Sequence, residues 1–83
     1  MNWELQLARP VHTRRSGLPE VLRTLGDAAD MIDEQLPESL RLRPMWQQVK
    51  DMLVTAAEMR TAQDVETATA LLERALEDEG SLG

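Results

Sequence analysis

The chain has 83 residues, of which 42% are hydrophobic and 29% charged, so its composition is that of one small globular domain. It holds no cysteine, which excludes disulfides, thiolate metal sites and cysteine nucleophiles, and no apolar run approaches the roughly 18 residues of a membrane span. The formal net charge of -6 disfavours general binding to nucleic acid and to anionic membranes.

The first predicted element is a β-strand within residues 3–13. Hydrophobic side chains recur there at every second position, which is the period of a half-buried strand. They share one parity and are Trp3, Leu5, Leu7 and Val11. Arg9 interrupts this apolar face, and Pro10 lacks the N–H group that a central strand would donate. We therefore expect the strand to bend near residues 9–10 or to lie at the edge of a sheet.

The segment after the turn signals of residues 14–19 allows two interpretations. In the first, Pro19 opens one long helix, because apolar residues recur at helical spacing as far as Leu36. In the second, residues 20–25 form a strand that pairs back on the first one, and a shorter helix follows with Asp27 near its N-cap.

Gly26 and the first strand together favour the second interpretation. A glycine inside a long helix would cost about 1 kcal/mol relative to alanine. The first strand also needs a partner for its backbone hydrogen-bonding groups. We therefore predict a β-hairpin over about residues 3–25 and a helix over 27–36.

The middle of the chain predicts a connector and a second helix. Pro37 cannot continue the preceding helix, so residues 37–43 are expected to connect it to the next one. Pro44 suits the first turn of a helix, and apolar residues at helical spacing extend that helix over about 44–60.

A third helix is predicted over about residues 62–78. Thr61 is its expected N-cap, and Asp64 follows three residues later as in a shortened capping box. Gly80 is expected to end the helix, so residues 79–83 are predicted to form a frayed tail.

These elements predict an α+β fold, in which an N-terminal two-stranded antiparallel β-hairpin packs on three α-helices within a single domain over residues 1–83. The expected core is formed by large apolar residues at strand or helix spacing, namely Trp3, Leu5, Leu7, Val11, Leu22, Leu25, Ile32, Leu36, Trp46, Val49, Leu53, Val65, Leu72 and Leu76. Both outer edges of such a hairpin would be open, and open edges invite pairing with another chain.

A series of short motifs runs along residues 3–76. In chain order they are Trp3, Pro10-Val11, Val21–Leu25, Asp27-Ala28-Ala29, Pro37, Trp46, and the Ala-rich set Ala68, Leu71, Leu72 and Ala75. This series resembles a domain-of-unknown-function family of short uncharacterised proteins that is found in many copies in rhizobial alphaproteobacteria. The family tends to have Trp-Pro where this chain has Leu36-Pro37. The resemblance implies a bacterial protein with a β-hairpin followed by three helices, and it implies no activity, cofactor or catalytic residue.

The residues that could carry chemistry point away from an enzyme. His12 is the only histidine and is expected to be exposed at the end of the strand, so a histidine-based metal site cannot form within one chain. The acidic residues Asp27, Asp30, Asp33 and Glu34 lack the spacing of a calcium loop and fit a solvated helix face. A nucleophile elbow and a phosphate-binding loop are both absent from the sequence. We therefore expect no enzymatic activity, no catalytic residue, no metal and no cofactor.

Two groups of residues are candidates for protein contacts. Met45, Met52 and Met59 recur every seven residues, which predicts either a wide core stripe or an apolar surface that binds a partner. Arg14, Arg15, Arg41 and Arg43 are candidates for a basic patch that contacts an acidic protein, or for pairing with the acidic helices of the chain itself.

The preferred function is a small non-enzymatic protein-interaction module that self-associates, as a homodimer, through the hairpin edge or the methionine stripe. The alternative is a regulatory adaptor that binds an acidic partner protein through the arginine patch. We expect a cytoplasmic location, because the first residues lack the basic and apolar regions of a secretory signal and cysteine is absent.

Overall fold

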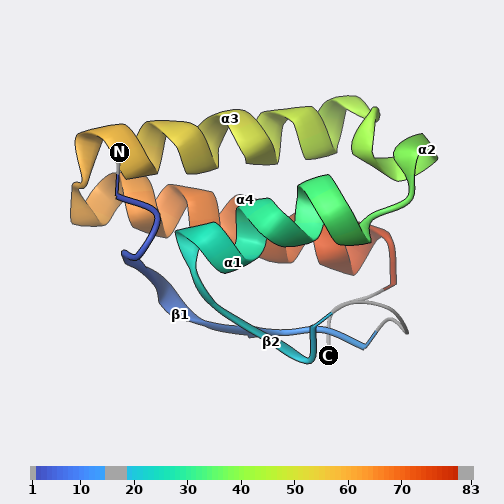
Figure 1. Ribbon diagram of the computed structural model, residues 1–83, viewed down its shortest axis with the longest axis horizontal. Coiled ribbons are helices and arrows are strands. Elements are labelled where there is room, and N and C mark those ends of the chain that lie inside the picture. Colours follow the sequence, from blue (N-terminus) through green and yellow to red (C-terminus); the bar gives the residue numbers. More distant parts are fainter. Residues whose placement is uncertain (1, 15–18, 81–83) are drawn as a thin grey trace.

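The computed structural model describes residues 2–14 and 19–80, and these residues form an α+β fold (Figure 1). A two-stranded antiparallel sheet comes first, followed by helical segments, which confirms the predicted fold class. The elements are β1 (Gln6–His12), β2 (Val21–Thr24), α1 (Leu25–Asp30), the π-helical turn η1 (Met31–Gln35), α2 (Glu38–Arg41), α3 (Pro44–Met59) and α4 (Ala62–Asp78).

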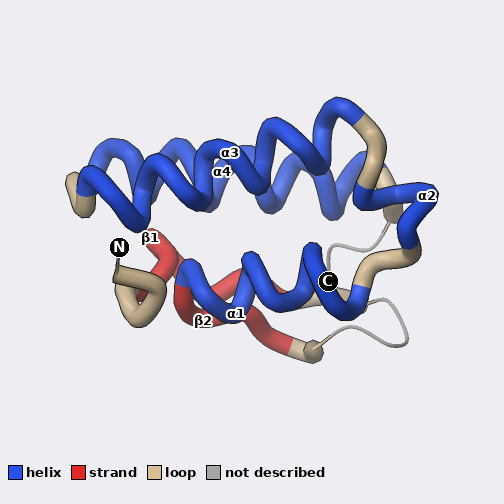
Figure 2. The backbone as a smooth tube through the Cα atoms, turned by 45° about the horizontal axis from the view of Figure 1, so that its top comes forward, coloured by secondary structure: helices blue, strands red, loops and turns tan. Residues whose placement is uncertain are grey.

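The helices α3 and α4 form an antiparallel pair, and the sheet and α1 pack against this pair from below (Figures 1 and 2). Strand β1 runs along α4, whereas α1 contacts both β2 and α3. The core lies between these elements because each of them buries one apolar face against the others. Among the described helices, none is both long and apolar enough to cross a membrane.

The core contains nearly all the side chains that the sequence predicts. Twelve of the predicted core residues are buried, and Trp3 and Leu5 are partly buried and pack against them. Met31, Leu40 and a set of alanines complete the core. The alanines lie where helices approach one another closely, since Ala56, Ala57, Ala68 and Ala75 of α3 and α4 are all fully buried.

The hairpin interpretation of residues 20–25 is confirmed. His12 pairs with Val21, and Val11 pairs with Leu22, in an antiparallel ladder. Toward the start of β1 the register shifts, because Gln6 pairs with Thr24. Strand β1 therefore holds extra residues between Gln6 and Val11. Of the two expectations for residues 9–10, a bend or an edge position, the edge position is confirmed, because the sheet has two strands.

The helix after β2 begins earlier than predicted. Thr24 is its N-cap, and its side chain accepts a hydrogen bond from the N–H of Asp27 at 3.0 Å. The carboxylate of Asp27 accepts in return from the N–H of Thr24, which completes a capping box. Asp27, which the sequence predicts near the N-cap, occupies the third position of the helix, so what differs from the prediction is the first residue of the helix, Leu25 in place of residue 27.

Gly26 lies in the first turn of α1 and contacts the N-terminal segment. Its N–H donates to the carbonyl oxygen of Trp3 at 2.8 Å. A Cβ atom at this position would lie 2.9 Å from the same oxygen, closer than real Cβ contacts. Glycine is therefore required here by close approach of the backbone.

The helix predicted over residues 27–36 ends in a wider turn. The N–H of Leu36 donates to the carbonyl of Met31 at 3.0 Å, which is the π-helical pattern of residues 31–35. The predicted connector over residues 37–43 contains the short helix α2, which buries Leu40. A single helical turn of this kind lacks the periodicity that identifies a helix in the sequence.

The last two helices lie close to their predicted bounds. Pro44 is the first residue of α3, and Thr61 is the N-cap of α4 and accepts from the N–H of Asp64 at 3.2 Å. Between them Arg60 has a φ of 56°, in the left-handed region, and ends α3 in place of a glycine. Of the tail predicted over residues 79–83, residues 81–83 lie outside the described residues.

Candidate functional site

The methionines of α3 differ in their surroundings. Met45 and Met52 are partly buried and pack against the core, whereas the side chain of Met59 is 60% exposed. Two causes separate Met59 from the others: a spacing of seven residues drifts by about 20° around an ideal helix, and Met59 is the last residue of α3. The first two methionines therefore widen the core stripe, and Met59 alone of the three is open to a partner.

Two of the arginines proposed as a basic patch, Arg41 and Arg43, bind groups of the same chain. The guanidinium of Arg41 donates to the backbone carbonyl of Asp33 at 2.7 Å, and that of Arg43 pairs with Glu79 at 3.1 Å. Arg14 is exposed, and Arg15 lies outside the described residues. The structure thus uses Arg41 and Arg43 to hold α2 and the start of α3 to their neighbours.

Arg9, which interrupts the apolar face of the strand, belongs to a cluster of ion pairs with α4. Its guanidinium pairs with Glu66 at 2.9 Å and also binds both carboxylate oxygens of Glu73 on the same helix. Hydrogen bonds to Glu73 and then to Glu66 raise the pKa of Arg9 further above its ordinary range, so its charge is fixed. The spacing of Glu66 and Glu73, seven residues apart on one helix face, is the only sequence signal for this cluster.

Strand β1 contacts α4, and one of its backbone donors is bound there. The N–H of Ala8 donates to the hydroxyl of Thr69 at 3.0 Å, and that hydroxyl donates to the carbonyl of Val65 at 2.8 Å. Thr69 is fully buried, and Pro10 has no N–H to offer. An added strand would therefore find few free donors along this part of β1.

The end of β2 is occupied in a different way. The carboxylate of Asp27 accepts from the N–H groups of Arg23 and Thr24 at 3.1 and 3.2 Å. The N–H of Thr13 donates to the carbonyl of Glu20 at 2.9 Å, which continues the ladder between the two strands. Thr69 and Asp27 thus bind backbone N–H groups of the hairpin that an added strand could otherwise use.

A groove with a largely apolar lining lies where the first half of β1 meets the turn between α3 and α4. Its volume is about 560 Å³, and its lining residues are Leu5, Gln6, Ala8, Arg60, Thr61, Ala62, Val65 and Glu66. The small side chains of Ala8 and Ala62 leave this space between the strand and the helix. Met59 is not one of the lining residues, but it is exposed and directly precedes Arg60, which is one of them. Met59 and the groove together are called the turn surface below.

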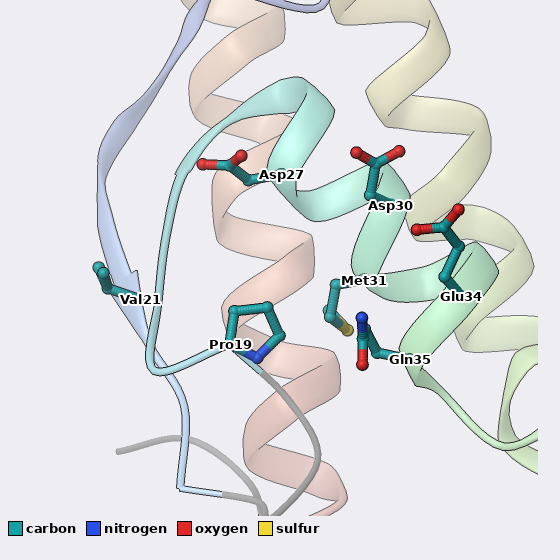
Figure 3. Close-up of a pocket in the computed structure, with 7 residues that line it drawn as sticks. All are labelled: Pro19, Val21, Asp27, Asp30, Met31, Glu34 and Gln35. Atoms are coloured by element: carbon teal, nitrogen blue, oxygen red, sulfur yellow. The ribbon is translucent and has the colours of Figure 1, made fainter.

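A second hollow, of about 310 Å³, lies between the start of β2 and the helix formed by α1 and η1 (Figure 3). The carboxylate of Asp27 turns toward β2, where it caps the helix, while Asp30 and Glu34 lie one turn apart along the helix. The fourth acidic residue of this segment, Asp33, pairs with Lys50 of α3 at 2.5 Å. Within residues 2–14 and 19–80, no three acidic, histidine or cysteine side chains are grouped so that they could hold a metal ion.

Comparisons of this chain with protein-family models, with curated proteins and with solved structures give no match. The resemblance to the rhizobial family therefore stays a prediction, and any function has to be argued from this chain's own surfaces. Of those surfaces, the turn surface includes an exposed large apolar side chain and an apolar hollow whose lining includes the next residue in sequence. The spacing of the methionines made Met59 a candidate, but no local pattern predicts the groove, because its walls come from residues some 55 positions apart.

Proposed function

We propose that this protein is a small non-enzymatic interaction module that self-associates through the turn surface. The observation that carries the proposal is the exposure of Met59 at the end of α3. Leu42 and Met59 are the large hydrophobic side chains that the described part of the chain exposes by more than half, and Met59 is the one next in sequence to a residue that lines an apolar hollow. Association through this surface would remove both from water.

The hairpin edge and the rest of the methionine stripe are less suited to self-association. The hairpin edges have donors already bound by Thr69 and Asp27, and Met45 and Met52 are already packed against the core. The arginine-patch adaptor loses support as well, since Arg41 and Arg43 are bound within the chain. The proposal includes a cytoplasmic location, which the absence of cysteine favours.

The size of the turn surface sets the expected strength of association. Burying one methionine side chain contributes about 1.5–3 kcal/mol, and a symmetric pair buries two of them along with parts of both grooves. Association costs at least about 4 kcal/mol of translational and rotational freedom. Two methionines contribute about 3–6 kcal/mol together, which at most slightly exceeds that cost, so we expect a weak, reversible dimer with a dissociation constant of about a millimolar or higher.

The test is the mass of the protein in solution by sedimentation equilibrium over a hundredfold concentration range, at low and at high salt. We expect the average mass to rise from that of a monomer toward that of a dimer. High salt should leave most of the association intact, because apolar burial is not screened by ions. A monomer at every concentration would refute self-association.

A further inference from the structure

We infer that residues 37–43, called the flap below, open from the rest of the fold as a unit and uncover the indole of Trp46. The flap consists of α2 and the residues on either side of it. The inference goes beyond the proposed function, because it concerns a movement within one chain and needs no second copy. It rests on two unsatisfied groups at the corner where α2 meets α3.

The first unsatisfied group is the indole N–H of Trp46, in the first turn of α3. Trp46 is 1% exposed, and its Nε1 atom has no hydrogen-bond partner among the described residues. Buried polar groups are nearly always paired in folded proteins, because an unpaired one has lost its bond with water and gained no other. A movement that lets water reach this N–H therefore removes a destabilising feature of the closed fold.

The second unsatisfied group is the side chain of Leu42, at the end of α2. It is 63% exposed, whereas Leu40 is buried and is the one buried residue of the flap. A single large apolar side chain therefore anchors the flap to the core. A helix of four residues is not stable by itself, so α2 keeps its structure only while Leu40 is docked.

The flap lies against the part of α3 that contains Trp46 (Figure 1). The side-chain amide of Gln47, the residue after Trp46, donates to the carbonyl of Arg41 at 2.9 Å. The N–H of Gln47 donates to the carbonyl of Arg43, so the flap continues directly into the first turn of α3. Leu40 and Trp46 belong to one core cluster. Undocking of Leu40 therefore opens the core at the Trp46 end of α3.

The other polar contacts that hold the flap closed lie at the surface. The guanidinium of Arg41 donates to the carbonyl of Asp33 at 2.7 Å, and Arg43 pairs with Glu79 at 3.1 Å. Exposed contacts of this kind contribute little each, because water forms the same bonds. Opening exchanges them for bonds with water and adds a bond at the indole. It also joins Leu42 to Leu40 and the indole as one apolar surface, which the closed chain lacks.

The experiment is hydrogen exchange of the full chain followed by NMR, which observes the indole N–H of Trp46 directly. The backbone N–H of Leu53, a fully buried residue in the middle of α3, serves as the reporter of global unfolding. We expect the indole N–H to be protected at least about tenfold less than that of Leu53. The N–H groups of Leu42 and Arg43, which bond within the flap, should be protected no more strongly than the indole.

Two variants separate opening of the flap from global unfolding. Thr69→Val removes the acceptor of the Ala8 N–H, far from the flap, and this acceptor stays bound when only the flap opens. It should speed exchange at Leu53 about fivefold and leave the indole rate unchanged.

Arg41→Gln removes the contact with Asp33 and should speed exchange of the indole about two- to tenfold. Arg74→Gln is its matched control, because Arg74 is an exposed arginine of α4 without a described hydrogen bond or ion pair. We expect Arg74→Gln to leave the indole rate unchanged.

Three outcomes would overturn the inference. The first is an indole N–H protected as strongly as that of Leu53. The second is a Thr69→Val variant that speeds both rates equally, since both groups then exchange through global unfolding. The third is fast indole exchange that Arg41→Gln does not change, because water then reaches Trp46 without movement of the flap. Rates that are equal at two protein concentrations belong to the single chain, so a failure of self-association leaves the inference standing.

Discussion

The hydrogen bond between the Ala8 N–H and the Thr69 hydroxyl joins the first strand to the last helix, and its loss can be measured. We expect Thr69→Val to lower the free energy of unfolding. Valine keeps the shape of threonine, so the fully buried site stays filled, but it removes the acceptor that lies 3.0 Å from the Ala8 nitrogen. A buried donor left without a partner costs about 1–3 kcal/mol.

The structure places the expected loss at the lower end of that range. Ala8 is an exposed residue, so water can reach its N–H once the hydroxyl is gone. The second bond of the Thr69 hydroxyl, to the Val65 carbonyl, is a local bond within the helix and contributes little. We therefore expect a loss of about 1 kcal/mol, or a fall in Tm of about 4–8 °C for a domain of this size.

Thr67→Val is the matched control, because it makes the same chemical change at an exposed position of α4, two residues before Thr69. The Thr67 hydroxyl donates to the carbonyl of Gln63 at 2.9 Å, as that of Thr69 does to Val65, but Thr67 is exposed and accepts no bond from β1. Urea denaturation and hydrogen exchange of the Ala8 amide measure both variants. Equal stability of the two variants would refute the reasoning, as would an unchanged rate of Ala8 exchange in Thr69→Val.

Three further predictions follow from local contacts. Gly26→Ala should lower the Tm although alanine favours a helix by about 1 kcal/mol, because its Cβ would lie 2.9 Å from the Trp3 carbonyl; a higher Tm would contradict this close approach. Asp27→Ala should lower the free energy of unfolding, measured by urea denaturation, by about 1 kcal/mol through loss of the capping box. Asp30→Ala, which loses no described hydrogen bond, should lower it by less than about 0.5 kcal/mol. Arg9→Gln should destabilise the fold at low salt and less so at high salt, because the variant loses the ion pairs with Glu66 and Glu73. The size of the loss should be constant from neutral to moderately alkaline pH, because an arginine and two carboxylates keep their charges throughout that range; a loss independent of salt would indicate packing instead of ion pairing.

The sequence predicted those parts of the fold that depend on local patterns. Alternation of apolar residues gave β1, and Gly26 together with the need for a strand partner gave β2. Helix capping gave the start of α4 at Thr61, because a hydroxyl before a helix and a carboxylate three residues later act within one turn. These signals are local, so they can be read without knowing what packs against them.

The parts that the sequence missed depend on residues far apart in the chain. The role of Arg9 follows from its contact with α4, some 60 positions away, and a charge on an apolar face gives no indication of that partner. The groove is likewise the space left between Ala8 and Ala62, which are distant in sequence. The π-helical turn at residues 31–35 differs from an α-helix by one hydrogen-bond step, and no residue type marks it.

The contact of β1 with α4 also determines the order in which the fold can be completed. Helices α3 and α4 are neighbours in sequence and can pair over a short loop, whereas Ala8 and Thr69 are 61 positions apart. A contact of that separation closes a long loop and forms slowly for a domain of this size. During synthesis from the N-terminus, β1 emerges well before the helix that it packs against. The apolar side chains of Leu7 and Val11 therefore stay uncovered by α4 while some 60 further residues are made.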